Sequence, residues 1–209
     1  METRNAFDTH VQQYEEWFGN NPFAYVSELH ALQELLPPNG NGIEIGVGTG
    51  RFAVPLGIQK GVEPSTAMAE LALKKGLDVV IGVAENLAFP DAKFDYALMV
   101  TTVCFLDDLD MAFHEAYRIL KPYGTFVIGF VDKNSPIGRS YEQRKDESLF
   151  YRDATFYSVD DLVLHLKTAG FTSFRFCQTL FGPVEEMREP SPVKKGYGEG
   201  SFVVIEANK

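Results

Sequence analysis

Hydrophobic residues near the start of the chain recur at the spacing of an amphipathic helix. Four of them follow one another at intervals of four, three and four residues: Phe7, Val11, Tyr14 and Phe18. A second series with the same spacing follows Pro22: Tyr25, Leu29, Leu32 and Leu36. Residues at these intervals share one face of a helix, and the Pro37-Pro38 pair ends it because proline lacks the N–H that a helix needs. The pattern predicts a helical N-terminal cap over residues 1–38.

From residue 42 onward, short apolar segments alternate with amphipathic ones. The apolar segments predict strands at 42–47, 58–63, 78–83, 94–101 and 125–131. Helices are expected between them at 49–56, 65–75 and 107–120, with Ser65 and either Asp107 or Asp108 as N-caps. This alternation is typical of a parallel sheet covered by helices on both faces, with right-handed crossovers. Residues 42–131 therefore predict a doubly wound α/β core.

The C-terminal third departs from this alternation. Residues 132–157 mix charged and aromatic side chains, and part of this insert, near 139–149, is expected to be helical. Ser158 and Asp161 form a capping box for a helix that ends at Gly170. The strands at 171–180 and 201–207 have no crossover helix between them, so they should pair antiparallel. The prediction is one domain over residues 1–209 with a seven-stranded, mostly parallel sheet, in which 158–209 supplies the final helix and an antiparallel strand pair.

The composition narrows the class of partner. The chain has 19 Lys and Arg against 29 Asp and Glu, a formal net charge of −10, which repels phosphate backbones and anionic lipid surfaces. No apolar run approaches the ~20 residues of a membrane span, and residues 1–10 lack the core of a signal peptide. Cys104 and Cys177 lie in apolar surroundings without a further ligand at metal spacing. We expect buried thiols, no metal, no nucleic-acid or membrane partner, and a cytoplasmic location.

The first core strand ends in a glycine-rich loop, Glu44-Ile-Gly-Val-Gly-Thr-Gly50. Glycines at a strand-to-helix junction permit a sharp turn and let a ligand approach the bare backbone. A dinucleotide fingerprint, G-x-G-x-x-G, would place its third glycine where this chain has Arg51. The loop therefore fits NAD or FAD imperfectly.

With an acidic residue two positions before its first glycine, the loop resembles the first motif of class I S-adenosylmethionine-dependent methyltransferases. Glu63 ends the second strand, where a carboxylate can accept both ribose hydroxyls of an adenosine. Residues 82–90 resemble the family stretch whose acid meets the adenine amino group, and Glu85 is the matching position. Residues 118–124, Arg-Ile-Leu-Lys-Pro-Tyr-Gly, resemble the helix-end motif R-x-L-K-P-G-G, with Tyr123 in place of a glycine.

The resemblance covers residues 7–170 and is closest to small-molecule methyltransferases related to quinone-biosynthesis enzymes. It implies S-adenosylmethionine as cofactor and transfer of its methyl group to a small-molecule acceptor by in-line displacement. The cofactor-binding residues would be Glu44, Gly46, Val47, Gly48, Glu63, Pro64, Ala84, Glu85 and Thr101. Because the cap and the insert enclose the acceptor in this family, the substrate-pocket residues would be Tyr14, Trp17, Phe18, Tyr141 and Tyr151.

The sequence leaves the catalytic group open. His10, on the cap, is a candidate general base, and the Thr101 hydroxyl could orient a substrate. Two other functions also remain open, a nicotinamide- or flavin-dependent oxidoreductase and a non-catalytic sensor of S-adenosylmethionine. Aminopropyl transfer would need extra pocket acids, and Asp107 and Asp108 are more simply a helix cap. Fold and cofactor motif do not determine the acceptor.

Overall fold

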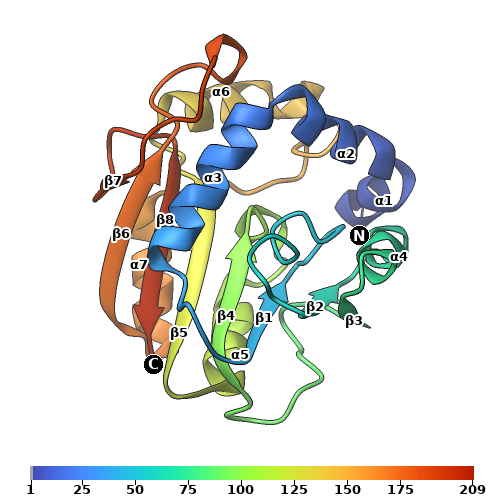
Figure 1. Cartoon of the computed structure of the whole chain (residues 1–209), viewed down its shortest axis with the longest axis vertical. Helices are drawn as coiled ribbons and strands as arrows, with labels where there is room; N and C mark the ends of the chain where they lie inside the picture. Colours follow the sequence, from blue (N-terminus) through green and yellow to red (C-terminus); the bar gives the residue numbers. More distant parts are fainter. Residues whose placement is uncertain (1) are drawn as a thin grey trace.

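One sheet of eight strands organises the chain in the computed structural model, which describes residues 2–209, with side chains from Ala6 onward. The strand order is β3-β2-β1-β4-β5-β8-β6-β7 (Figure 1). Strands β1 to β5 are parallel, and β8 pairs antiparallel with both β5 and β6. The predicted doubly wound, mostly parallel sheet with an antiparallel final strand is confirmed.

All seven predicted strands are present. They are β1 (Gly42–Ile45), β2 (Lys60–Glu63), β3 (Asp78–Ile81), β4 (Phe94–Val100), β5 (Leu120–Val131), β6 (Thr172–Thr179) and β8 (Phe202–Asn208). The eighth, β7 (Lys194–Lys195), pairs with β6 and was not predicted, because two residues are too few to display a strand period. Strand β5 also begins earlier than expected, at Leu120, which pairs with Phe94 before the register shifts.

Seven α-helices and three short 3₁₀ turns complete the described chain. The helices are α1 (Glu2–Thr9), α2 (Val11–Asn20), α3 (Pro22–Leu35), α4 (Thr66–Lys74), α5 (Leu109–Ile119), α6 (Pro136–Arg144) and α7 (Val159–Ala169). The 3₁₀ turns are η1 (Val103–Phe105), η2 (Lys145–Glu147) and η3 (Val184–Glu186). Ser65, Asp108 and the Ser158 capping box begin α4, α5 and α7, as predicted.

Two helix predictions are wrong. Residues 49–56 form consecutive turns, because Gly50 and Gly57 have left-handed backbones at φ +81° and +74° and Pro55 lies between them. The first amphipathic series is divided at His10, whose backbone is not helical. Helix α1 instead docks on the start of α4, where Asp8 accepts a hydrogen bond from the Ser65 hydroxyl at 2.6 Å.

The alternation of side chains along the strands separates two cores. In β4, Leu98 and Val100 pack on the face covered by α3, whereas Ala97 and Met99 pack on the face covered by α5 and α7. Both faces of the sheet are therefore covered (Figure 1). Cys104 and Cys177 are buried free thiols, as expected.

The cap and the insert lie at one edge of the sheet. Helices α1, α2 and α6 are drawn over the end at which β1 and β4 finish (Figure 1), the edge where parallel α/β sheets bind ligands. The predicted cap begins at Met1, which lies outside the described residues. In the part of the chain that the structure describes, every helix is too short or too polar to span a bilayer.

Candidate functional site

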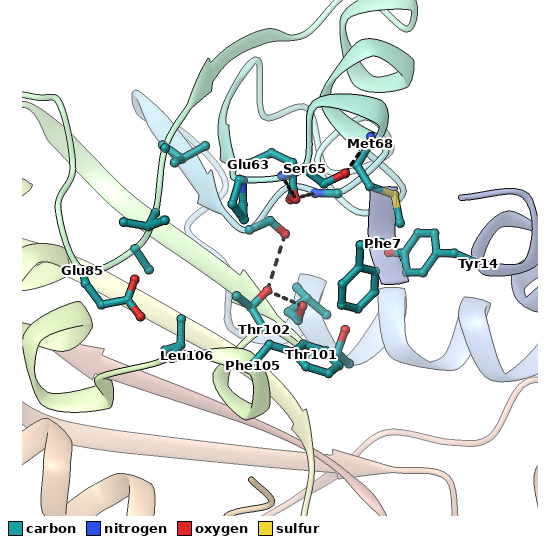
Figure 2. Close-up of a pocket in the computed structure, with 18 residues that line it drawn as sticks. Phe7, Tyr14, Glu63, Ser65, Met68, Glu85, Thr101, Thr102, Phe105 and Leu106 are labelled. Atoms are coloured by element: carbon teal, nitrogen blue, oxygen red, sulfur yellow. Dashed lines mark hydrogen bonds between the residues drawn. The ribbon is translucent and has the colours of Figure 1, made fainter. Parts of the chain in front are cut away.

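A cavity at the carboxyl ends of β1, β2 and β4 holds about 820 Å³, part of it open to solvent. Figure 2 shows Phe7 and Tyr14 on one side of it and Glu85 on the other. Seven of the nine predicted cofactor residues line it: Gly46, Gly48, Glu63, Pro64, Ala84, Glu85 and Thr101. The glycine loop and the strand ends thus meet at one site.

The glycine loop closes over the end of β2. The backbone N–H groups of Gly46 and Val47 both donate to the Val62 carbonyl, at 2.8 and 2.9 Å. Gly46 has φ +75°, and a Cβ there would lie 2.4 Å from the Thr102 hydroxyl oxygen. Because an L side chain would meet both strain and a clash, only glycine suits this position. The loop consequently presents bare backbone to the cavity.

Glu63 is held rigidly beside this backbone. Its Oε2 accepts a hydrogen bond from the Gly48 N–H at 2.8 Å, and its Oε1 accepts one from the Ser65 N–H at 2.9 Å. Burial raises the pKa of Glu63, the two backbone bonds oppose the rise, and the charge of Asp8 adds to it. Each carboxylate oxygen has a second lone pair, so Glu63 retains acceptor capacity toward the cavity.

Two predicted cofactor residues, Glu44 and Val47, do not line the cavity. Val47 packs against Gly61, where a Cβ would lie 2.5 Å from a Val47 methyl group. Glu44 is fully buried, and its Oε2 has no hydrogen-bond partner among the described residues. Burial raises the pKa of Glu44 well above its usual value. A buried carboxylate oxygen without a donor is costly, and this cost favours the protonated form of Glu44.

Glu85 lies at the far end of the cavity (Figure 2). Its Oε1 accepts hydrogen bonds from the backbone N–H groups of Asp107 at 2.9 Å and Asp108 at 3.4 Å. These bonds attach the carboxylate to the segment that begins α5. Glu85 is therefore positioned by the fold, and not by a ligand, at the edge predicted for adenine.

Two acids attach the first helices to the rest of the protein. Asp8 joins α1 to the start of α4, and Glu15 joins α2 to the glycine loop. Asp8 accepts from Ser65, as described above, and Glu15 accepts from the Arg51 guanidinium at 2.5 and 3.1 Å and from the Thr49 hydroxyl. Lys75 lies 3.7 Å from the same carboxylate. Sequence reasoning missed these contacts, together with further lining residues: Phe7, Ser65, Met68 and Phe105. Their contacts join segments distant in sequence, which no local pattern reveals.

Several predicted cap residues lie elsewhere. Tyr14 was predicted as a substrate-pocket residue. It lines the larger cavity, beside Gly48 of the glycine loop. Phe18 is buried among Tyr14, Trp17, Tyr25 and Phe52, and neither Phe18 nor Trp17 lines a described cavity. His10 also lies outside both cavities, with a ring nitrogen 3.2 Å from the Gln13 side chain. Phe18 is therefore part of the core, whereas Tyr14 forms part of the cavity wall.

Comparisons with known proteins agree with this geometry. A family model described as a methyltransferase domain matches residues 43–128. A solved structure from Thermotoga maritima, described as an S-adenosylmethionine-dependent methyltransferase and possible histamine N-methyltransferase, is 54% identical to this chain. The similarity covers 98% of this chain and 99% of that one, with a TM-score of 0.96. This chain belongs to the S-adenosylmethionine-dependent methyltransferases.

Other relatives support the same family. An uncharacterized protein of Methanocaldococcus jannaschii is 42% identical over 98% of this methyltransferase and 99% of its own length. A ubiquinone/menaquinone biosynthesis C-methyltransferase of Rickettsia typhi is 24% identical, over 77% of this chain and 87% of its own. The predicted family, enzyme class and cofactor are confirmed, and the oxidoreductase and sensor alternatives are set aside.

A smaller cavity adjoins the first in this methyltransferase. It is lined by Cys104, Phe130, Val131, Tyr157 and other residues of β5 and the insert, and Thr101 lines both cavities. The rings of Tyr141 and Tyr151 lie 5.0 Å apart and nearly parallel at its wall. Burial raises the pKa of Tyr141 to about 12, so its hydroxyl stays protonated and can donate a hydrogen bond. Tyr141 and Tyr151 are thus the two predicted pocket residues that share a cavity away from the glycine loop.

Thr101 lines both cavities and has an unusual backbone conformation. Its φ is +49°, a left-handed conformation that is strained for a β-branched residue. The Thr101 N–H donates to the Gly129 carbonyl at 2.7 Å, which fixes it at the end of β4. Strain of this kind collects at functional sites. Among the described side chains, from residue 6 onward, no group of three or more His, Cys, Asp or Glu could hold a metal ion.

Proposed function

We propose that this methyltransferase transfers the methyl group of S-adenosylmethionine to a small aromatic acceptor held between the cap and the insert. The observation that carries the proposal is the Glu63 carboxylate, fixed by the Gly48 and Ser65 N–H groups beside the glycine loop. A carboxylate in this position can accept the two ribose hydroxyls of the cofactor. Gly46 and Gly48 would let the methionine portion approach the backbone, and Glu85 would meet the adenine edge.

The cavity suits the positive charges of this cofactor. The side chains of Glu63 and Glu85 line it, and after burial the charges of Glu63 and Glu15 help to raise the pKa of Tyr14 on its wall. When bound, S-adenosylmethionine supplies a methyl group on a positively charged sulfur, which such surroundings tolerate.

The smaller cavity supports an aromatic acceptor. Tyr141 and Tyr151 line its wall, and Thr101 lies where the two cavities meet. One relative is described as a possible histamine N-methyltransferase and another as a quinone-biosynthesis C-methyltransferase, and both of these acceptors are rings. The residues would then act mainly by holding the acceptor in line with the methyl group and excluding water. Such positioning accounts for roughly 7–11 kcal/mol of a barrier in favourable cases.

The test is a calorimetric titration with S-adenosylmethionine, S-adenosylhomocysteine, NAD and FAD. We expect only the two adenosyl ligands to bind. Glu63→Gln should weaken both by about tenfold or more, because a charged hydrogen bond contributes about 1.5–3 kcal/mol. Glu70→Gln, an exposed acid on α4, is the matched control and should bind as the wild type does. Binding of NAD or FAD in preference to both adenosyl ligands would overturn the proposal.

A further inference from the structure

Glu28, on the inner face of α3, is a buried carboxyl that the proposed function does not use. Its side chain is 5% exposed. It makes no hydrogen bond or ion pair with any residue from 6 to 209, and burial raises its pKa to about 8. A carboxyl without a partner in the interior is destabilising unless a donor or a cation reaches it. Its retention there calls for an occupant beside it.

Contacts along α3 locate Glu28 at the acceptor end of the sheet. Leu32, one helical turn later, packs on β5, where its Cδ2 lies 2.9 Å from the position of a Cβ on Gly129. Helix α3 runs back along the sheet from the cap (Figure 1). Glu28 comes four helical residues before Leu32, a distance of about 6 Å toward the cap. Val131 comes two strand residues after Gly129, about 6.6 Å in the same direction, so Glu28 and Val131 lie at the same level. Val131 lines the smaller cavity.

A second set of contacts also places this part of α3 beside the end of β5. The hydroxyl of Ser27, next to Glu28, accepts from the Ser191 N–H at 2.8 Å, and the Ser191 carbonyl accepts from the Thr179 hydroxyl. Thr179 pairs with Phe202, which pairs with Val131. Two independent chains of contacts therefore bring the α3 segment that holds Glu28 to the end of β5.

The electrostatic neighbours of Glu28 include tyrosines of both cavities, together with Tyr25 of α3, which lines neither. After burial, the charge of Glu28 helps to raise the pKa values of Tyr14, Tyr141 and Tyr151. Tyr14 lines the larger cavity, and the other two line the smaller one. Glu185 acts on Tyr141 in the same direction, and no cation is paired with Glu28 among the described side chains. The acceptor end of the site is consequently acidic and aromatic, and Glu28 becomes charged as the pH rises past about 8.

We propose that Glu28 determines the substrate class, by binding the ammonium group of a small aromatic amine between α3 and the stacked rings of Tyr141 and Tyr151. This inference rests on the function proposed above. An ammonium supplies both the charge and the donors that the Glu28 carboxylate lacks. Glu28 is thus a specificity residue for the acceptor and has no part in holding the cofactor.

The test compares matched ligands on protein saturated with S-adenosylhomocysteine. Tyramine and 4-ethylphenol differ by the amine, as do histamine and 4-ethylimidazole, and each is titrated at pH 8.5, where the imidazoles are neutral and the amines charged. In at least one pair we expect the amine to bind at least tenfold more tightly than its neutral partner. Glu28→Gln should remove this preference, and Glu34→Gln, an exposed acid on the same helix, should keep it.

The outcomes separate the two proposals. Glu28→Gln should bind S-adenosylhomocysteine as the wild type does, and thermal unfolding checks that it is folded. No preference for the amine in either pair, or a preference that survives in Glu28→Gln, overturns the role of Glu28 and leaves the methyltransferase proposal intact. Failure of the wild type to bind S-adenosylhomocysteine overturns both. Glu28→Asp, which keeps the charge on a shorter side chain, should retain part of the preference.

Discussion

The side chain of Thr102 occupies the space that a Cβ on Gly46 would need. A Cβ built on Gly46 lies 2.4 Å from Thr102 Oγ1 and 2.5 Å from its Cγ2. The same hydroxyl donates to the Val100 carbonyl at 3.0 Å, which holds it in place. The first glycine of the loop and the first residues after β4 are therefore fitted to each other.

Gly46→Ala should lower the free energy of unfolding by at least about 2 kcal/mol, because it adds this clash to a left-handed backbone. Gly57→Ala is the matched control, since Gly57 has φ +74° but nothing within 4 Å of a Cβ, and it should cost only about 1 kcal/mol. Urea unfolding measures both. The double variant Gly46→Ala/Thr102→Ala should recover part of the loss, and equal costs at both glycines would contradict the fit.

Tyr123 stands where the family motif has a glycine, with φ +66° and a 92% exposed side chain. The turn has kept the left-handed backbone although the glycine is gone. Tyr123→Gly should therefore stabilise the protein by about 0.5–1 kcal/mol, because it relieves the strain and loses almost no contact. Tyr123→Ala keeps a Cβ and should give no gain. Thermal unfolding of the three proteins distinguishes strain from a hidden contact of the ring.

The buried Glu28 carboxyl should make stability fall as the pH rises. Its pKa is about 8 in the folded protein against 4.5 for an ordinary glutamate, so the folded state holds a proton that the unfolded state has released. By linkage, the unfolding free energy drops between these two values. The drop is on the order of 2–5 kcal/mol at about 1.4 kcal/mol per pH unit.

The measurement is denaturant unfolding of wild type and Glu28→Gln from pH 4 to pH 9. Wild type should lose stability relative to the variant across this window, since the amide does not ionise. Subtracting the two curves removes the contributions of other buried acids such as Asp132, which the variant retains. A constant difference between the two proteins would show that Glu28 ionises normally.

Glu15 should control how firmly α2 covers the cofactor cavity. Burial raises its pKa, but hydrogen bonds from Arg51 and Thr49 prevail and lower it, so this contribution to stability is present at pH 7 and is lost as the pH falls below about 4.5. Glu15→Gln should speed hydrogen exchange over residues 11–20 and the release of S-adenosylhomocysteine, at a cost of about 1 kcal/mol. Glu16→Gln, an exposed neighbour on α2, should change neither rate.

The sequence predicted the proposed cofactor half of the site more completely than the acceptor half. Gly46, Gly48 and Glu63 follow directly from strand ends and glycine spacing, which are local properties. Tyr14 and Phe18 were assigned to the acceptor because their helical face is visible in the sequence, but the surface that this face meets is not. Glu28 was missed because one acid on an amphipathic helix has no periodic signal.

By itself, the sequence determined seven of the eight strands, the caps of α4, α5 and α7, and the glycine-rich loop that we propose as the cofactor site. Each of these depends on side chains a few residues apart, where propensity and periodicity act. Only the tertiary structure decided that residues 49–56 form turns, that α1 and α2 divide at His10, and that Glu28 lies level with Val131. These outcomes depend on contacts between distant segments, whose geometry arises when the two cores pack against the sheet.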